Sequence, residues 1–279
     1  MGPNPKQVAQ KYAGLIKEVD RAIAPLIESV NVDGISRHNR GYKAYEADKF
    51  RNFVEVEKTR FLKALGVITQ EFSEGTICDL GCFIPYLPTA LALLEYNVKI
   101  VDKYQLYEGR FKGEISKLAD SKHIQLCDLD ILQDDFYPLG ENDVVMLMAV
   151  VEHFNGSPRN LMEKTRGIIS SSGFLLFEVP NIAEFIKRIQ MLLGHSPLAP
   201  YEDYLQSEYP FMGHNREMTV DEVLQLLDQT GFRCEWLECY DYWKGGVTTL
   251  KGSIMQVVKQ IAPLRHKGQV ICAKARPIK

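Results

Sequence analysis

Two patterns of apolar residues alternate along the middle of the chain. Short apolar runs, typical of buried strands, predict strands at 77–79, 98–102, 124–128, 144–148 and 173–178. Apolar residues at helical spacing predict helices near 89–96, 107–119 and 157–170. Because strands that alternate with helices build a parallel sheet covered on both faces, the pattern predicts an α/β fold.

Other patterns precede this core. Apolar positions at helical spacing predict one helix over 5–30 and a second over 44–65, with a polar break at 31–41 between them. We interpret residues 1–70 as an N-terminal helical cap or lid, followed by one domain over 71–279.

Residues 181–215 interrupt the alternation and predict an insert in this domain. They contain a short helical pattern at 183–193 and an aromatic group further on. After the insert, Thr219 and Glu222 form a capping box that starts a helix, and Gly231 ends it. Strand patterns follow at 233–239 and 269–273, separated by an amphipathic stretch at 250–264.

Composition excludes several classes of protein. The 279 residues are 46% hydrophobic and 25% charged, as in an ordinary globular protein. The net charge of -3 comes without a basic cluster, so we expect no nucleic-acid partner, and no apolar run suggests membrane insertion. Six cysteines without a CxxC pair, and no signal pattern, indicate a cytoplasmic protein with free thiols and no structural metal. The oligomeric state is not predicted.

The turn after the first predicted strand has the residues of a cofactor site. Asp79 and Gly81 follow the apolar run at once, and the next strand ends on Asp102. In open α/β sheets the ligand lies beyond the carboxyl ends of the strands, and an acid at this second position accepts hydrogen bonds from ribose hydroxyls. The spacing therefore predicts a cofactor that contains adenosine.

The residues of this turn discriminate between such cofactors. Phe83 and Pro85 stand where a cofactor-binding loop usually has its second and third glycines. A pyrophosphate must approach backbone N–H groups, which Phe83 obstructs and which Pro85 and Pro88 lack. S-adenosylmethionine carries a sulfonium and no phosphate. The turn thus counts strongly against a nicotinamide cofactor and only mildly against S-adenosylmethionine.

Residues 76 to about 275 resemble a class I S-adenosylmethionine-dependent methyltransferase of the ubiquinone-biosynthesis-like type. CDLGC is similar to the first motif of that family, in a glycine-poor variant, and Asn97 replaces a common glycine as a left-handed cap. DVVMLMAVVEHF and SSGFLLFEVPN are similar to its fourth- and fifth-strand motifs, and GHNREMTVDEVLQLLDQTGF to the helix that follows. The specific signal is their order and spacing.

The resemblance implies a Rossmann-like, doubly wound, mostly parallel seven-stranded sheet with an antiparallel last strand. It also implies S-adenosyl-L-methionine as cofactor and S-adenosyl-L-homocysteine as product. The acid that flanks the adenine is either Asp128 or Asp130. The residues assigned to the cofactor are Asp79, Gly81, Cys82, Phe83, Asp102, Lys103, Asp128, Leu129, Asp130, Ala149 and Val150.

Methyl transfer from a sulfonium needs no metal and no covalent nucleophile, because the electrophile is already activated. A hydroxyl acceptor benefits from a base with a near-neutral pKa, so His153 and His214 are the candidate catalytic residues. A structural role stays open for each histidine. His153, together with Glu152, would stabilise its turn and the next helix, and His214 would fix its loop.

Three further segments have two interpretations each. The SRHNRGYKAYE stretch, with His38, Arg40, Tyr42 and Tyr45, is a substrate lid or, preferably, a solvated loop. The aromatic group Tyr201, Tyr204, Tyr209 and Phe211 is an acceptor wall or, preferably, the insert's own core. The 250–264 stretch contacts a membrane or partner or, preferably, packs on the sheet.

The sequence therefore favours an S-adenosylmethionine-dependent methyltransferase, preferably O-directed, with a small-molecule or glycan acceptor. N- and C-methylation stay open. The alternative is a catalytically degenerate methyltransferase fold with a regulatory or scaffold role. Intact acids at 79, 102 and 128 argue against that alternative, since an inactive site has no need of them.

Overall fold

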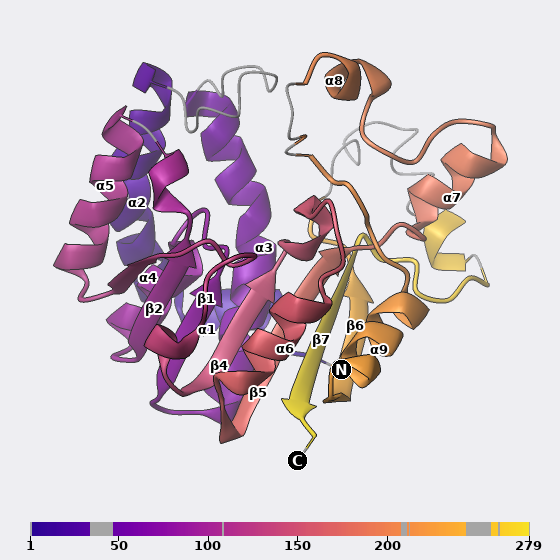
Figure 1. The fold of residues 1–279 in the computed structure, drawn as a ribbon. Coiled ribbons are helices and arrows are strands. Elements are labelled where there is room, and N and C mark those ends of the chain that lie inside the picture. The colour runs from indigo at the N-terminus through magenta and orange to yellow at the C-terminus, as the bar shows by residue number, and fades with distance from the viewer. Residues whose placement is uncertain are drawn as a thin grey trace.

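One mixed sheet organises the described part of this computed structural model, which comprises residues 2–33, 47–107, 109–207, 211, 213–243, 258–261 and 263–278. Its seven strands follow the order β3-β2-β1-β4-β5-β7-β6 (Figure 1). They are β1 (Thr76–Leu80), β2 (Asn97–Asp102), β3 (Gln125–Asp128), β4 (Asn142–Met148), β5 (Ile169–Pro180), β6 (Phe232–Tyr240) and β7 (Val270–Pro277). Strands β1 to β5 pair in parallel, whereas β7 is antiparallel to β5 and β6. The predicted doubly wound sheet with an antiparallel last strand is confirmed.

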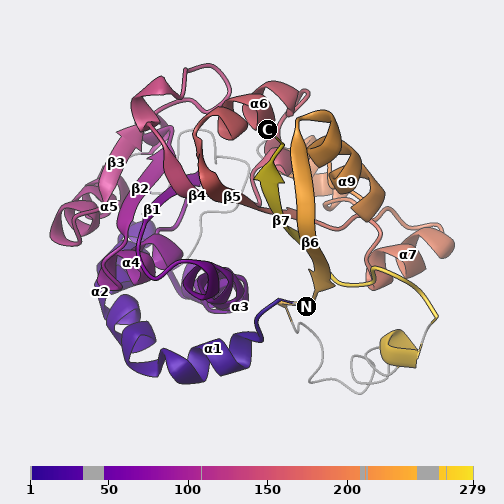
Figure 2. The same ribbon diagram turned by 90° about the horizontal axis from the view of Figure 1, so that it is seen from below.

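Helices cover both faces of the sheet (Figure 2). One face carries α1 (Pro5–Lys11), α2 (Ala13–Asp33), α3 (Ala47–Glu71), α4 (Tyr86–Leu93) and α5 (Gly109–Ser121), and the other carries α6 (Arg159–Gly167) and α9 (Val220–Gln229). Successive residues of a strand are buried in different apolar clusters, as Ile77 and Cys78 of β1 illustrate. Burial on both faces explains why the strands read as continuous apolar runs.

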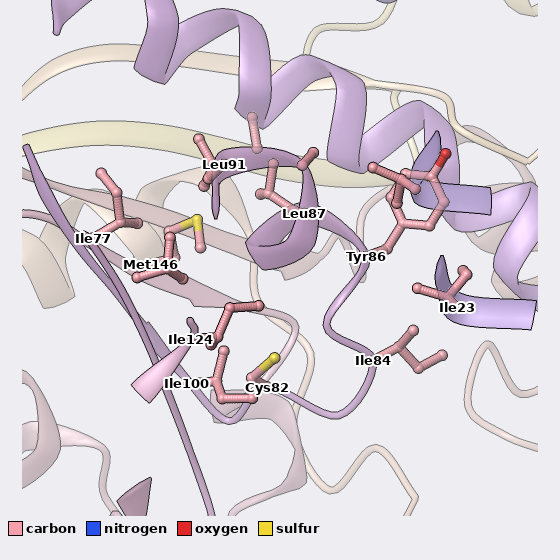
Figure 3. Close-up of a cluster of buried hydrophobic side chains, with 14 of the residues drawn as sticks. Ile23, Ile77, Cys82, Ile84, Tyr86, Leu87, Leu91, Ile100, Ile124 and Met146 are labelled. Atoms are coloured by element: carbon pink, nitrogen blue, oxygen red, sulfur yellow. The ribbon is translucent and has the colours of Figure 1, made fainter. Parts of the chain in front are cut away.

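The N-terminal helices belong to the same core as the strands. Figure 3 shows Ile77 of β1 and Met146 of β4 in one cluster with Leu87 and Leu91 of α4. Ile23 of α2 is part of this cluster and is 1% exposed. Helices α1 to α3 therefore cover the sheet directly, and the division of the chain at residue 70 stays a prediction.

Three boundaries in this half differ from the predicted ones. The helix predicted over 5–30 is interrupted at Tyr12, which caps α1 with φ -109° and ψ 26°. Helix α4 begins at Tyr86 instead of residue 89, because Pro88 lies in the first turn, where its missing N–H breaks no helical hydrogen bond. Asn97 is not a left-handed cap: it starts β2, and Glu95 has the positive φ of 68° instead.

The 181–215 segment contains α7 (Phe185–Leu192) and the short α8 (Tyr201–Leu205). After it, the predicted capping box of Thr219 and Glu222 is present at the start of α9. Within the described ranges, no helix combines the length and the apolar character that crossing a membrane requires.

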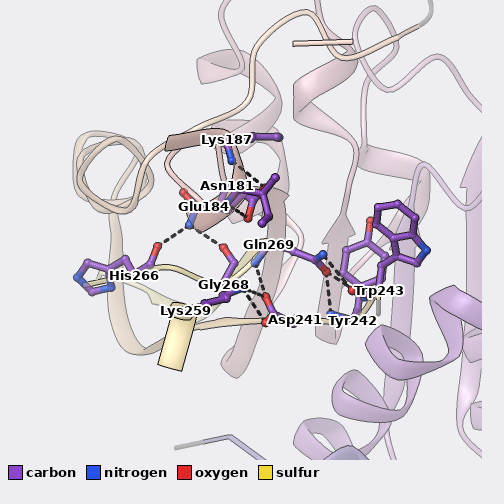
Figure 4. Close-up of polar contacts among 11 residues, drawn as sticks. Asn181, Glu184, Lys187, Asp241, Tyr242, Trp243, Lys259, His266, Gly268 and Gln269 are labelled. Atoms are coloured by element: carbon purple, nitrogen blue, oxygen red, sulfur yellow. Dashed lines mark hydrogen bonds and ion pairs between the residues drawn. The ribbon is translucent and has the colours of Figure 1, made fainter. Parts of the chain in front are cut away.

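A polar cluster joins the segment after β5, the segment after β6 and the residues before β7 (Figure 4). The Asn181 side chain donates to the backbone carbonyl of Gly268 over 2.8 Å, and Lys259 pairs with Asp241 at 2.5 Å. The side-chain oxygen of Gln269 accepts a hydrogen bond of 3.2 Å from the backbone of Tyr242. These contacts hold Tyr242 close to the carboxyl ends of the central strands.

Candidate active site

A cavity of about 470 Å³ opens at the carboxyl ends of the central parallel strands. Residues after β1, β2, β4 and β5 form one side of it, and α3 forms the opposite side. Most of the predicted site residues line it: Asp79, Gly81, Cys82, Phe83, Asp102, Ala149, Val150, His153 and His214. The cavity therefore lies where open α/β sheets bind their ligands.

Gly81 sets the shape of the turn after β1. Its φ of 77° lies in the left-handed region, and a Cβ placed there would lie 2.7 Å from Cγ2 of Val150. The backbone N–H groups of Gly81 and Cys82 donate to the Val101 carbonyl over 2.8 and 3.1 Å. Only glycine combines this backbone conformation with this close approach, so the one glycine kept in the motif is structurally required.

Two carboxylates end the neighbouring strands β1 and β2. Asp102 accepts hydrogen bonds from the Tyr107 hydroxyl at 2.9 Å and from the Lys103 backbone N–H at 2.7 Å, and Asp79 accepts one from the Cys82 thiol. Burial raises the pKa of Asp79 to about 7, and it raises the pKa of Asp102 to about 6 against these hydrogen bonds. Both groups gain from a cationic or hydrogen-donating ligand, because it would stabilise their ionised forms.

Phe83 lies between the cavity and the core. Its ring contacts Phe50, Phe111 and Tyr107 at centroid distances of 6.0, 6.1 and 6.2 Å, and it also lines the cavity. The bulky residue in the first motif is thus part of an aromatic cluster beneath the turn, and it leaves the cavity open.

The end of β3 and the loop after it contact the end of β2. Asp128 pairs in register with Asp102, and the Leu129 N–H donates to the Asp102 carbonyl over 3.1 Å. Asp130 is engaged by Lys103, whose Nζ lies 2.9 Å from its carboxylate. Lys103, Asp128, Leu129 and Asp130 do not line the cavity. Ile131 of the loop after β3 does. Contact of the other four residues with a cofactor stays a prediction.

The chain after β4 is strained where it borders the cavity. Ala149 has a φ of 57°, which is uncommon for a residue with a side chain, and its N–H donates to the Glu178 carbonyl of β5 over 2.8 Å. Backbone strain of this kind collects at ligand sites. The turn directs the short helix Val151–His153 towards the cavity.

Glu152, His153 and His214 meet at one corner of the cavity. The two imidazole rings lie edge to face with centroids 5.1 Å apart. Glu152 is 0% exposed, and no described residue donates a hydrogen bond to either oxygen of its carboxylate. Burial raises its pKa to about 7, although His214 and Arg60 act in the opposite direction. The structure thus joins both predicted catalytic residues with a buried acid.

A buried ion network from α3 forms the wall next to this corner. Arg60 is 7% exposed and pairs with Glu57 of its own helix and with Glu178 of β5. Glu178 also accepts a hydrogen bond from the Tyr240 hydroxyl, and the Tyr242 ring lies 5.4 Å from the Arg60 guanidinium. Sequence reasoning missed this network. Its signals were charged residues on the apolar face of a predicted helix and an acid inside a buried strand.

The charges around the cavity are unequal. Its described lining contains four carboxylates, those of Glu57, Asp79, Asp102 and Glu152, and the single guanidinium of Arg60. When its carboxylates are ionised, a site with this balance attracts cations and disfavours phosphates.

Three other candidate segments lie away from this cavity or outside the described part. The lid candidate with His38, Arg40, Tyr42 and Tyr45 lies outside the described residues, as do Tyr209 and most of the 250–264 stretch. Of the aromatic group, Tyr204 contacts Tyr201 and Phe211, and Tyr201 is 72% exposed. None of these three lines the cavity.

Comparison with solved structures identifies the fold. An S-adenosylmethionine-dependent methyltransferase from Thermotoga maritima, described as a possible histamine N-methyltransferase, has a TM-score of 0.51 and 13% identity, over 82% of this chain and 94% of its own. The O-methyltransferase NcsB1 from neocarzinostatin biosynthesis was solved with S-adenosyl-L-homocysteine and 1,4-dihydroxy-2-naphthoic acid. It has a TM-score of 0.50 and 13% identity, over 95% of this chain and 70% of its own. The pyocyanin biosynthetic protein PhzM has a TM-score of 0.50 and 15% identity, over 82% of this chain and only 58% of its own. The chain therefore has the class I methyltransferase fold. No protein-family sequence model and no curated protein sequence matches it.

Proposed function

We propose that the protein is an S-adenosylmethionine-dependent methyltransferase that methylates a hydroxyl group of a small-molecule or glycan acceptor. The observation that carries this proposal is the cavity at the strand ends with four carboxylates and one guanidinium in its described lining. A sulfonium and an ammonium suit this charge, whereas the phosphates of a dinucleotide do not.

The cofactor would lie along the β1, β2 and β3 ends. Asp79, with the Gly81–Cys82 turn, would hold the methionine end, and Asp102 would accept hydrogen bonds from the ribose hydroxyls. Asp128 is the better candidate for the adenine, because Asp130 is already engaged by Lys103 at 2.9 Å.

The acceptor would lie between the strand ends and α3. Aromatic rings of Phe53, Phe61, Phe154 and Tyr242 line this part of the cavity and suit an aromatic or sugar acceptor. His153 is the proposed base. Its Nδ1 lies 3.1 Å from the Gly213 carbonyl, which only accepts, so Nδ1 carries a proton and Nε2 is the basic nitrogen.

The alternative is a methyltransferase fold without catalytic activity. The two buried carboxylates with raised pKa values, Asp79 and Asp102, support an active site, because a purely structural role does not require the burial of two neighbouring acids.

The test is turnover on an acceptor panel. The wild-type protein is incubated with S-adenosylmethionine and separate sets of phenols, sugars, amines and carboxylic acids, and formation of S-adenosylhomocysteine is measured. We expect turnover with hydroxyl compounds and at least a hundredfold loss in His153→Ala. Turnover only with amines would contradict O-methylation. Binding of the cofactor without turnover on any set would favour the degenerate alternative.

A further inference from the structure

We propose that Glu152, His153 and His214 form a binding site for a divalent transition-metal cation at the acceptor end of the cavity. Each residue offers one ligand atom, and these three atoms all lie within 4.8 Å of one another. Two imidazole nitrogens and one carboxylate oxygen are a ligand set that such cations prefer, with coordination positions left open for other ligands.

The two segments that supply the ligands are fastened to each other. The Asn215 N–H donates to the Glu152 carbonyl over 2.7 Å, and the Asn215 side chain donates to the His153 carbonyl over 2.8 Å. His214 therefore has a fixed place beside the helix Val151–His153. The cluster is a built corner of the cavity and not a chance meeting of surface residues.

A hydrogen-bond acceptor behind Nδ1 orients both imidazoles. Nδ1 of His153 lies 3.1 Å from the Gly213 carbonyl oxygen, and Nδ1 of His214 lies 2.9 Å from a carboxylate oxygen of Glu217. Both partners accept hydrogen bonds, so each Nδ1 carries the proton and each Nε2 carries the lone pair. Lys187 in turn pairs with Glu217. Metal-binding histidines show this arrangement, with a carbonyl or carboxylate behind the ring.

Glu152 is the second observation that points to a cation. Its side chain is completely buried and borders the cavity, and within the described chain no other residue donates a hydrogen bond to either carboxylate oxygen. A buried carboxylate without a partner is costly, and coordination of a cation is one of the ways in which proteins satisfy such a group.

The role of this cation rests on the proposed function. A metal-bound acceptor hydroxyl would have a lowered pKa and would release its proton to water. The acceptor oxygen would then form the new O–CH₃ bond while the S–CH₃ bond breaks, and the sulfur would keep that electron pair. In this state His153 is a metal ligand, and the cation replaces it as the group that activates the hydroxyl.

Cobalt binding tests the site without any methyl transfer. Untagged protein, first stripped with a chelator, is titrated with Co²⁺ and followed by visible absorption and calorimetry. We expect one Co²⁺ per chain, with affinity at least tenfold weaker in His153→Ala and in His214→Ala, and about tenfold weaker in Glu217→Gln. His195→Ala removes an exposed histidine far from the cluster in sequence and should bind Co²⁺ as the wild type does.

The controls separate this inference from the proposed function. S-adenosylhomocysteine affinity shows that each variant is folded, and two independent histidine variants keep the test readable if one misfolds. No Co²⁺ binding, or binding that keeps the wild-type affinity in both histidine variants, with or without thiolate absorption, would overturn the site. If S-adenosylhomocysteine binds while Co²⁺ does not, the metal inference fails and the proposed function stands. If Co²⁺ binds at this cluster while S-adenosylhomocysteine does not, the proposed function fails instead.

Discussion

The two ends of the cavity are built from different parts of the chain. The β1–β2 end comes from one short stretch, in which Asp79 and Asp102 each accept hydrogen bonds from nearby residues. The acceptor end combines α3, the β4 turn, β5 and the segment after α7, and its Glu152 has no described donor. The carboxylates of the first end have hydrogen-bond donors nearby, whereas the burial of Glu152 at the second end is offset by the nearby charges of His214 and Arg60. This difference indicates that hydrogen bonds fix the cofactor end in place, whereas Glu152 at the acceptor end still lacks a hydrogen-bond partner among the other described residues.

The largest expected effect is on the stability of the acceptor end. Arg60→Met leaves Glu57 and Glu178 buried without their cation, so we expect a loss of about 3–5 kcal/mol in the free energy of unfolding near pH 8. The loss should shrink as the pH falls, because burial raises the pKa of the Glu57 carboxyl, which then takes up a proton. Urea unfolding at several pH values measures it.

A surface arginine provides the control for this variant. Arg159 makes an exposed pair with Glu163 at 3.6 Å, so Arg159→Met should cost less than about 1 kcal/mol. An equal loss in both variants would show that the buried network does not stabilise the acceptor end.

Asp79→Asn should change the cofactor end in two opposite ways. The carboxyl has its pKa raised from 3.8 to about 7, so it stabilises the fold while protonated, and this contribution is lost as the pH rises through about 7. The variant should therefore be more stable than the wild type at pH 8, by roughly 1–3 kcal/mol, and nearly equal to it at pH 4. We expect its affinity for S-adenosylmethionine to fall at least tenfold.

Urea unfolding and calorimetry on the same preparations check both halves of this expectation. A variant that is less stable at pH 8, or that binds the cofactor as tightly as the wild type, would contradict the role given to Asp79.

Gly81→Ala tests the turn that separates the two ends. The new Cβ would meet Val150 at 2.7 Å in a left-handed backbone, so we expect a loss of about 1–3 kcal/mol in stability and a weaker cofactor site. Val150→Ala in the same chain should recover part of the loss. Gly113 of α5 has open space around its Cα, so Gly113→Ala should be neutral or stabilising by up to about 1 kcal/mol. Thermal unfolding compares Gly81→Ala, its double variant with Val150→Ala, and Gly113→Ala. A Gly81→Ala variant as stable as the wild type would contradict the role given to this turn.

The smallest expected effect is a difference between two ligands of the cofactor end. As the pH falls from 8 to 5, Asp79 and Asp102 take up protons at pKa values of about 7 and about 6. The sulfonium of S-adenosylmethionine then loses its carboxylate environment, so its affinity should fall several-fold more than that of S-adenosylhomocysteine. Titration calorimetry at four pH values gives both curves. Parallel curves would show that the sulfonium is not near these carboxylates.

The sequence predicts the two ends unequally, for a physical reason. Asp79, Gly81 and Asp102 belong to one strand–helix–strand unit, whose periodicity and spacing place them together. Arg60 and Glu178 are separated by 118 positions and meet only through packing of α3 on the sheet. The helical spacing places Glu57 and Arg60 on the apolar face of α3, which indicates that they are buried. It does not show which distant acid pairs with Arg60.

The sequence also does not predict the environment of Glu152, although the residue lies beside a predicted site residue. The positions of His153 and His214 were predicted, whereas Glu152 was assigned only to the turn. Its isolation from donors depends on how the Val151–His153 helix lies against the 213–219 segment, which no sequence pattern encodes.

The central claim is that a carboxylate-lined cavity at the strand ends binds a cationic, phosphate-free adenosyl cofactor. Titration calorimetry with S-adenosylmethionine, S-adenosylhomocysteine and NADH, on the wild type and on Asp102→Asn at pH 8, tests it most directly. We expect binding of the first two ligands and not of NADH, with at least a tenfold loss in Asp102→Asn. Absence of heat with both adenosyl ligands, or affinities that Asp102→Asn leaves unchanged, would contradict the claim.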